Sequence, residues 1–388
     1  MRPTDRERIV VIGGGIAGVS AAFALAGHPS RPEVVLAEAE AELARHTTGR
    51  SAAQLILNYG AGPVRALTVA SLPFLHKPPE RYWDQALLTE QSVIMVGTES
   101  QGDSIDASLA AAAAVNPEVR EISIAEAGER FPALRTDRFA RATLEAGSYD
   151  IDVAGLHQCF VRGFRDLGGR VAVLTRVDGA APRDGGGWTL DTTDGPLEAD
   201  RVVNAAGAWG DVVAAGAGLA PVGLVPKRRT AFMVASRWAD SARWPMVADI
   251  DLAWYLKPDG PQFLCSPADE TPSPPTDAKP EEIDVALAID RINEATTLDI
   301  RSVRSQWAGL RTFTADGSMV IGPDPDRPDF IWCVGQGGTG IQTSPAAGRL
   351  VADLALDGAP GDTFAAIDLD LTGLSPERIR RGKTDRSM

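Results

Sequence analysis

The chain opens with blocks of apolar and polar positions that predict a strand, a helix and a second strand. The apolar run 9–12 leads into the glycine-rich stretch 13–18, an alanine-rich segment follows, and a second apolar run, 34–37, ends at Glu38. Short apolar runs bounded by glycine are typical of buried strands, and the longer segment between them suits a helix. The pattern indicates a βαβ unit with parallel strands.

Helical and strand patterns also alternate at about 155–207 and again near the C-terminal end, whereas the segments between them carry β-like runs. The proline-rich stretch 266–282 predicts an exposed loop. We therefore predict a mixed α/β (α+β) fold with two interleaved domains. A Rossmann-like cofactor domain takes residues 1–79, 143–222 and 307–388, and a substrate domain on a mostly antiparallel sheet takes 80–142 and 223–306.

Composition narrows the function classes. Of the 388 residues 44% are hydrophobic, yet no apolar stretch reaches the roughly 20 residues of a membrane span, and the polar first eight residues lead into no signal-like segment. The net charge of −14 disfavours nucleic acid and anionic lipid as partners. Three scattered cysteines and four scattered histidines lack metal-ligand spacing. We expect a cytoplasmic enzyme without metal, nucleic acid or transmembrane segment.

The glycines of the first turn each have a physical role in dinucleotide binding. Gly13 permits the tight turn, Gly15 lets the backbone approach a pyrophosphate, and Gly18 lets the helix pack closely on the sheet. The helix start then binds phosphate through its N–H groups and dipole. Glu38 stands where a carboxylate takes ribose hydroxyls. The glycines alone also suit a plain tight loop, but strand, helix, strand and acid in order favour a bound dinucleotide.

Two further segments favour FAD over NAD, which uses the same fold. The polar stretch 45–53 offers donors to a cofactor whose long axis continues into the protein. Near the C-terminal end, the strand-like run 330–334 leads into the glycine-rich turn 335–340 and a helix start. A flat isoalloxazine ring needs such a side-chain-free surface, and a helix N-terminus near its pyrimidine end stabilises the anion formed on reduction. A glycine loop that serves topology alone is the alternative.

These residues carry a family resemblance that covers nearly the whole chain. The sequence resembles the D-amino acid oxidase (DAO) superfamily of flavoproteins and, within it, bacterial FAD-dependent D-amino acid dehydrogenases of the D-arginine dehydrogenase type. The matching stretches are 46–53, 150–152, 203–209, 226–229, 244–246, 255–259, 294–298, 307–311 and 336–344. The resemblance implies a βαβ FAD domain and an antiparallel-sheet substrate domain.

The glycine patterns and the resemblance together give the residues expected to bind FAD. Some relatives attach FAD covalently through histidine or cysteine, but His46 also matches members that bind FAD without a bond. Gly309 stands where the sarcosine oxidase branch has its flavin-linking cysteine, so we expect non-covalent FAD. The expected contacts are Gly13, Gly15, Ile16, Ala17, Gly18, Glu38, His46, Thr48, Gly49, Arg50, Ser51, Ala52, Val173, Ala205, Gly207, Trp209, Gly338, Gly340, Ile341, Gln342 and Thr343.

Oxidising an amino acid at Cα requires its carboxylate to be held so that the Cα–H faces flavin N5, a task that suits arginine. The resemblance implies carboxylate contacts at Arg311 and Arg229, a hydroxyl at Tyr255 and a pocket lid at Tyr59. A basic triplet such as 227–229 also suits a solvated patch, and core packing is the alternative for both tyrosines. The predicted positioning set is Arg311, Arg229, Tyr255, Tyr59, Gln54 and Gln342.

Two positions depart from the D-arginine dehydrogenase type. Gln54 replaces an active-site histidine, so no histidine-mediated pH dependence is expected. Val93 falls where basic-substrate members have a glutamate, although Glu90 supplies a charge if the alignment slips. An apolar wall leaves a substrate cation unpaired, at a cost of several kcal/mol. We therefore expect neutral or hydrophobic D-amino acids in a side-chain pocket formed by Val93, Ile56 and Met246.

The sequence thus predicts an FAD-dependent D-amino acid dehydrogenase or oxidase that acts on CH–NH2 donors. Hydride passes from Cα of the neutral amine to flavin N5, and the imino acid hydrolyses to a 2-oxo acid and ammonia. No residue is a compelling general base, and the reaction requires none. The alternatives are a glycine- or sarcosine-type oxidase, an FAD-dependent 2-hydroxy-acid dehydrogenase, and a flavin-binding subunit that serves a partner. The electron acceptor, whether O2, a quinone or another molecule, is not identified.

Overall fold

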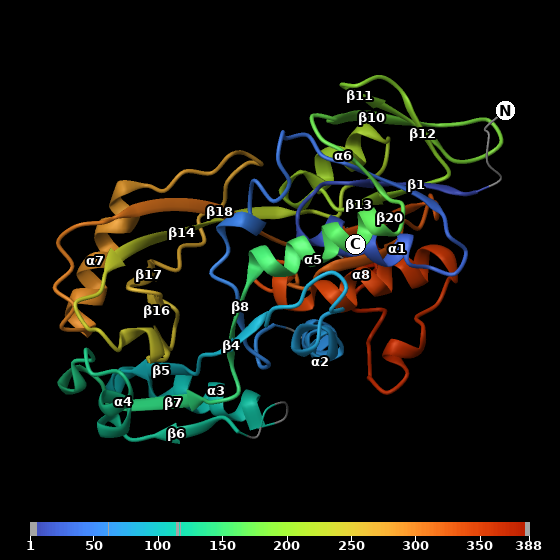
Figure 1. The fold of residues 1–388 in the computed structure, drawn as a ribbon. Helices are drawn as coiled ribbons and strands as arrows, with labels where there is room; N and C mark the ends of the chain where they lie inside the picture. Colours follow the sequence, from blue (N-terminus) through green and yellow to red (C-terminus); the bar gives the residue numbers. More distant parts are fainter. Residues whose placement is uncertain (1–5, 61, 114–115, 117, 385–388) are drawn as a thin grey trace.

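The computed structural model describes residues 6–60, 62–113, 116 and 118–384, which form two lobes lying side by side (Figure 1). One lobe is built on a six-stranded sheet and the other on an eight-stranded sheet. The remaining strands form two sheets of three strands each. This arrangement confirms the mixed α/β fold predicted from the sequence.

The six-stranded sheet is parallel except for one edge strand, β19, which runs antiparallel to β20. Helix α1 (Ile16–Ala26) packs on this sheet and contacts helices α5 (Val153–Asp166) and α8 (Gly340–Leu356), which also contact the sheet. All four positions from Ile9 to Ile12 are buried, as expected for an interior parallel strand covered on both faces. In sheet order the strands are β19 Val320–Pro323, β20 Phe330–Val334, β13 Arg201–Asn204, β1 Arg8–Ile12, β2 Glu33–Ala37 and β9 Arg170–Ala172.

The turn from β1 into α1 depends on two glycines. Gly13 has a φ of +105°, a conformation that L side chains rarely adopt. A Cβ atom on Gly18 would lie 1.8 Å from the carbonyl oxygen of Gly13, so a larger residue would push the helix away from the turn. The predicted strand, glycine turn, helix and second strand are therefore confirmed, and their spacing brings the helix start to the carboxyl end of β1.

The eight-stranded sheet is antiparallel except where β15 pairs in parallel with β5. Helices α4 (Ile124–Arg130) and α7 (Glu282–Ala295) pack their apolar sides into the core on one face of this sheet. Strands β14 and β18 extend from it toward the other lobe (Figure 1). In sheet order the strands are β18 Ser305–Phe313, β14 Val225–Ala235, β17 Gln262–Ser266, β16 Tyr255–Asp259, β15 Met246–Asp249, β5 Val93–Gly97, β7 Arg141–Glu145 and β6 Arg120–Ile122.

Two of the expected domain boundaries fall inside strands of the large sheet. Strand β7 continues past residue 142, and β18 begins before residue 307. Both strands keep their pairing with the large sheet across those points. The division of the chain into two domains stays a prediction, and the sheets show where the chain passes between the lobes.

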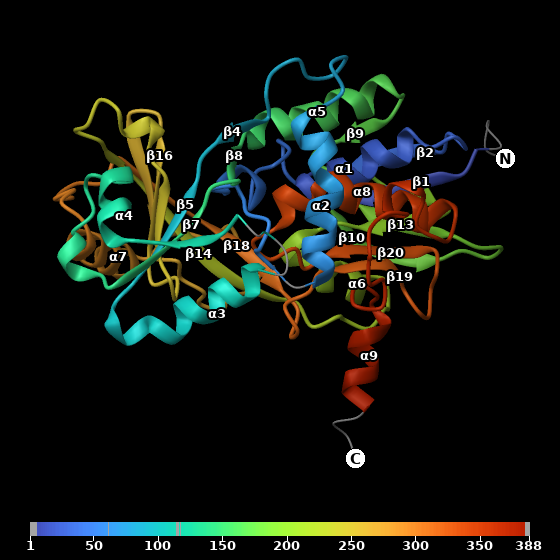
Figure 2. The same ribbon diagram turned by 90° about the horizontal axis from the view of Figure 1, so that it is seen from below.

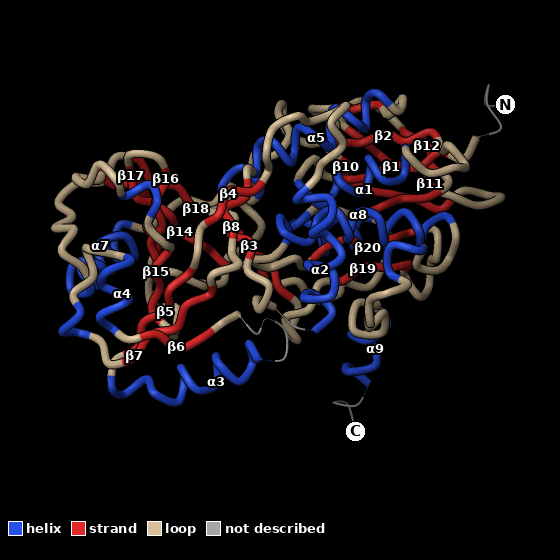
Figure 3. The backbone as a smooth tube through the Cα atoms, turned by 60° about the horizontal axis from the view of Figure 1, so that its bottom comes forward, coloured by secondary structure: helices blue, strands red, loops and turns tan. Residues whose placement is uncertain are grey.

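The remaining elements connect and cover the two lobes. The small sheet β3 (Gln54–Leu55), β8 (Tyr149–Ile151) and β4 (Leu88–Glu90) lies between them (Figure 3). Helix α9 (Glu377–Thr384) projects away from the body (Figure 2). Across the described residues, no helix has the length and apolarity to cross a bilayer. The other elements are α2 Gly62–His76, α3 Gly102–Ala113, α6 Gly210–Gly216, β10 Val177–Pro182, β11 Trp188–Thr192 and β12 Leu197–Ala199.

Candidate active site at the junction of the two large sheets

A cavity of about 530 Å³ lies where the two lobes meet. Its wall combines the β1–α1 turn, the segment that follows β2, the glycine-rich turn before α8, and residues of β14, β16 and β18. Segments far apart in the sequence thus meet at one site. The predicted residues that line it are Gly13, Gly15, Ile16, Ala17, Glu38, His46, Thr48, Arg50, Ser51, Ala52, Ala205, Gly207, Trp209, Arg229, Tyr255, Arg311, Gly338, Gly340 and Ile341.

Two helix N-termini line this cavity, and both fit an elongated anionic cofactor. Among the described residues, the N-caps of α1 (Gly15) and α8 (Thr339) make no side-chain capping bond, and neither helix has an acid in its first turn. Their N–H groups and positive dipole ends therefore favour a negatively charged ligand. A Cβ on Gly15 would lie only 3.2 Å from Thr48 Oγ1, which accepts a hydrogen bond from the Ile16 N–H at 2.9 Å, so glycine leaves room for this bond.

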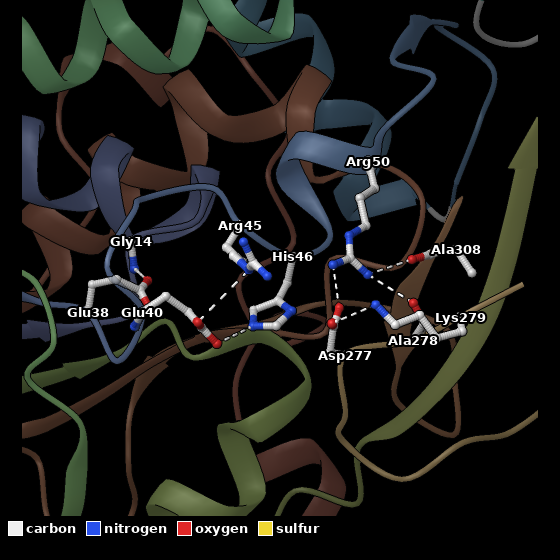
Figure 4. A network of polar contacts seen from close by, with 10 residues as sticks. All are labelled: Gly14, Glu38, Glu40, Arg45, His46, Arg50, Asp277, Ala278, Lys279 and Ala308. Carbon is white, nitrogen blue, oxygen red and sulfur yellow. Dashed lines mark hydrogen bonds and ion pairs between the residues drawn. The ribbon is translucent and has the colours of Figure 1, made fainter. Parts of the chain in front are cut away.

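Glu38 lies in the cavity wall at the end of β2. Its Oε2 accepts a hydrogen bond from the Gly14 N–H at 2.6 Å, and its Oε1 accepts one from the Glu40 N–H at 2.8 Å (Figure 4). These two bonds hold the carboxylate beside the β1–α1 turn. This position is compatible with the predicted contact to ribose hydroxyls.

Five of the expected cofactor residues are not part of the cavity lining, namely Gly18, Gly49, Val173, Gln342 and Thr343. Gly18 packs against the turn, and Thr343 donates its hydroxyl to the Thr339 carbonyl. Gly49 and Val173 line a neighbouring cavity of about 520 Å³. A Cβ on Gly49 would lie 2.5 Å from the Ala44 carbonyl oxygen, so this glycine permits a close backbone approach.

Sequence reasoning missed residues 175–178, which occupy the part of the lining where Val173 was expected. Strand β9 ends at Ala172, and the chain then turns back so that the Thr175 N–H donates to the Glu38 carbonyl at 2.7 Å. These residues follow β9, which pairs with β2, the strand directly before Glu38, and only the structure shows this pairing.

His46 has its own contacts beside the cavity. Its Nε2 lies 2.9 Å from Glu40 Oε1, and its ring centre lies 4.8 Å from that of Trp209. Its Nδ1 is buried and finds no partner within the described part of the chain. Figure 4 shows the histidine with Glu40 and Arg45 on one side of the network. One ring nitrogen is thus held by a carboxylate, as expected of a hydrogen-bonding loop histidine.

Arg50 reaches across to the other lobe (Figure 4). Its guanidinium donates to the Ala308 carbonyl at 2.8 Å and the Ala278 carbonyl at 3.0 Å, and it forms an ion pair with Asp277. The hydrogen bond from Lys279, followed by that from Arg50, holds the pKa of Asp277 well below its usual range. The guanidinium of Arg50 therefore binds the segment before α7, while Arg50 also lines the cavity, so that the expected cofactor contact stays a prediction.

The two predicted carboxylate-binding arginines come from neighbouring strands. In the antiparallel register Arg229 on β14 pairs with Gly309 on β18, two residues before Arg311. Side chains alternate along a strand, so both arginines lie on the same face of the sheet. Nη1 of Arg311 donates to the Tyr59 hydroxyl at 3.4 Å. Within the described ranges Arg311 forms no ion pair.

Arg229 is 9% exposed and is already partly engaged. Its Nε donates to the Asp269 carbonyl at 2.9 Å, and its Nη2 lies 3.0 Å from Glu270 Oε1. Burial, followed by repulsion from Arg311, lowers the pKa of Arg229. Among the described residues the pair therefore offers an anion one guanidinium without an ion pair, Arg311, and one partly neutralised guanidinium, Arg229.

The residues predicted for the side-chain pocket gather in one apolar cluster with Tyr255. Val93 and Met246 are direct partners on the parallel strands β5 and β15, and Ile56 packs against the same cluster. Glu145 is the cross-strand partner of Val93, and its carboxylate accepts from Asn58 Nδ2 at 3.3 Å. Burial raises the pKa of Glu145.

Both predicted glutamines lie outside the cavity lining. Gln54 donates to the Gln91 carbonyl at 2.8 Å. Gln342 is 2% exposed, accepts from the Ile56 N–H at 3.1 Å and donates to the Ile56 carbonyl at 3.2 Å. It also donates to Thr68 Oγ1 at 2.9 Å. Its amide therefore fastens the segment that leads to Tyr59.

Comparisons with known proteins agree with this architecture. The model of the family described as FAD dependent oxidoreductase (DAO) matches residues 8–354. Glycine oxidase of Geobacillus kaustophilus (strain HTA426) is 25% identical over 90% of this chain and 93% of its own length. Mitochondrial dimethylglycine dehydrogenase of Rattus norvegicus is 25% identical over 94% of this chain but only 44% of its own length. The crystal structure of L-proline dehydrogenase from P. horikoshii has a TM-score of 0.84 at 21% identity, covering 97% of this chain and 98% of that chain.

Proposed function

The chain belongs to the FAD dependent oxidoreductase (DAO) family, whose members bind FAD, and on that premise we propose that it oxidises D-α-amino acids to imino acids. The observation that carries the proposal is Arg311, a cavity-lining guanidinium without an ion pair in the described part of the chain. Such a group binds a carboxylate through paired, charge-assisted hydrogen bonds. The imino acid then hydrolyses to a 2-oxo acid and ammonia.

In this proposal the residues of the large sheet orient the substrate. Arg311 and Arg229 hold its carboxylate, and the hydroxyls of Tyr255 and Tyr59 add hydrogen bonds from the sheet and from the loop. When bound, FAD supplies the acceptor for the Cα hydride at flavin N5. The backbone of the β1–α1 turn and the two helix N-termini hold the cofactor, and Glu38 takes the ribose hydroxyls.

The preference for neutral or hydrophobic side chains rests on the apolar cluster of Val93, Met246 and Ile56. A cationic side chain against these apolar residues would lose its hydration, and the carboxylate of Glu145 beside Val93 already accepts hydrogen bonds from Asn58 and Asn116. The D configuration, and the relation to the D-arginine dehydrogenase type, rest on the motif resemblance of the sequence. Non-covalent FAD is part of the proposal and is supported by the contact of His46 with Glu40.

A glycine- or sarcosine-type oxidase is the second candidate. Relatives named glycine oxidase and dimethylglycine dehydrogenase are among the most similar proteins. The same two arginines serve glycine or a secondary amine, whose carboxylate is identical. A 2-hydroxy-acid dehydrogenase has less support, because Gln54 cannot accept the hydroxyl proton as a histidine would. The electron acceptor is not identified, and a cytoplasmic location stays a prediction from the sequence.

Anaerobic mixing of the holoenzyme with candidate substrates distinguishes these functions. We expect rapid bleaching of the flavin absorbance by neutral D-amino acids and none by their L enantiomers. Bleaching by glycine or N-methyl compounds alone would support the second candidate. Bleaching by 2-hydroxy acids alone would overturn both.

A further inference from the structure

The carboxylate of Glu270 stands among the cations of the proposed carboxylate site, and the backbone fixes its place. The segment 269–273 lies along the first residues of β14. The Thr230 N–H donates to Asp269 Oδ1 at 2.6 Å, the Arg228 N–H donates to the Thr271 carbonyl at 2.8 Å, and the Ser273 N–H donates to the Pro226 carbonyl at 2.9 Å. These bonds on both sides of Glu270 hold its Cα beside the strand.

Glu270 divides its carboxylate between two cations. Its Oε1 lies 3.0 Å from Arg229 Nη2, and its Oε2 lies 2.9 Å from Lys227 Nζ. Partial burial opposes ionisation, but the hydrogen bond with Lys227 and the charges of Lys227, Arg229 and Arg311 together lower the pKa of Glu270. The carboxylate is therefore ionised at neutral pH.

An incoming carboxylate competes with this built-in anion. Lys227, Arg229 and Arg311 alternate along paired strands on one sheet face, so Glu270 neutralises part of their combined charge. A substrate carboxylate at Arg311 and Arg229 meets the repulsion of Glu270 and finds one Arg229 nitrogen already engaged. We propose that Glu270 lowers the affinity of the site for monocarboxylate ligands. This inference rests on the proposed function, because it takes the two arginines as the carboxylate site.

A purely structural role for Glu270 predicts the opposite result. If its main effect were to hold Arg229 in place, removing the charge would loosen the guanidinium and weaken carboxylate binding. The Asp269 carbonyl, however, holds Arg229 Nε independently at 2.9 Å. A glutamine at 270 also keeps an oxygen that accepts from Nη2. Glu270→Gln therefore removes the charge while preserving the geometry.

The test is titration of the holoenzyme with benzoate, a monocarboxylate without an oxidisable Cα–H, followed by the flavin spectrum and by calorimetry. We expect Glu270→Gln to lower the benzoate Kd about 5-fold, as one unit charge several ångströms away affects an anion at a partly buried site. The gain should shrink as salt is raised. Glu270→Asp, which restores the charge, should return the Kd toward the wild-type value.

Glu281→Gln is the matched control. The Glu281 carboxylate pairs with Arg228, which alternates with Arg229 and so lies on the other face of β14. This variant loses the same charge and should bind benzoate like the wild type. An unchanged or higher Kd in Glu270→Gln would overturn the inference, provided that Arg311→Met weakens benzoate binding. If benzoate does not bind the wild-type holoenzyme at all, the proposed carboxylate site itself fails.

Discussion

The buried amide of Gln342 is expected to hold the loop that carries Tyr59. Gln342→Met keeps the length and shape of the side chain but removes its bonds to the Ile56 N–H, the Ile56 carbonyl and Thr68. The carbonyl retains a bond from the Tyr59 N–H at 3.3 Å, and the Thr68 hydroxyl still donates to Val64. The Ile56 N–H is the group that loses its partner.

A buried N–H without a partner costs about 1–3 kcal/mol. The loss of the bonds from Gln342 to the Ile56 carbonyl and to Thr68 brings the expected decrease in the free energy of unfolding to about 2–3 kcal/mol. A chain of 388 residues unfolds with a large entropy, so this loss lowers Tm by only about 3 °C. The effect on binding should be clearer. Tyr59 lies three residues beyond Ile56, so KM for D-amino acids should rise about 10-fold while kcat falls less.

Thermal unfolding of the holoenzyme and steady-state kinetics on a neutral D-amino acid test this reasoning. Thr68→Val is the control, because it removes one bond to Gln342 and leaves both Ile56 bonds in place. It should cost about 1 kcal/mol and leave KM unchanged. Wild-type Tm and KM in Gln342→Met would refute the positioning role of this glutamine.

Three further predictions concern specificity, cofactor attachment and pH dependence. Val93→Glu should raise kcat/KM for D-Lys relative to D-Leu, and no gain for D-Lys would argue against Val93 as part of the pocket wall. Acid precipitation should release FAD and leave the pellet colourless, whereas a yellow pellet would indicate a covalent bond. Despite partial burial, the hydrogen bond from Arg378 lowers the pKa of Asp316 to about 2. This depressed pKa contributes stability above about pH 4 that is lost as the pH falls toward 2. Asp316→Asn should therefore flatten the dependence of the free energy of unfolding on pH in that range. An unaltered pH dependence would exclude the pair of Asp316 and Arg378 as its source.

Local patterns explain why much of the fold could be predicted. The glycines at 13 and 18 meet steric requirements that act within a few residues, and the apolar run 9–12 directly reports burial on both faces of a strand. Such features depend on the neighbours of a residue along the chain. Val93, Met246 and Ile56 gather in one apolar cluster, but their place in a substrate pocket stays a prediction.

The contacts that the sequence did not reveal join side chains to partners that are distant in the chain. Arg50 lines the candidate cavity and its cofactor contact stays a prediction, but the sequence did not reveal that its guanidinium binds carbonyls more than 220 residues away. Gln342 was expected beside the substrate and the cofactor, which stays a prediction, and the sequence did not reveal its bonds to a backbone segment 286 residues away. Glu270 lay in a stretch expected to be an exposed loop, and only the pairing of that stretch with β14 places it beside Arg229. The periodicity of apolar residues predicts helices and strands, but it does not predict contacts between residues far apart in the chain.

The most direct test of the central claim asks whether Arg311 holds an amino acid carboxylate for oxidation at Cα. The measurement is the rate of anaerobic flavin reduction by D-leucine and by 3-methylbutylamine, which lacks the carboxylate, in wild type, Arg311→Lys and Arg311→Met at matched FAD content. We predict rapid reduction of the wild type by D-leucine alone, an about 30-fold or greater loss of kcat/KM in Arg311→Met, and an intermediate value in Arg311→Lys. Reduction of Arg311→Met at the wild-type rate, or equal reduction of the wild type by the amine, would contradict the account.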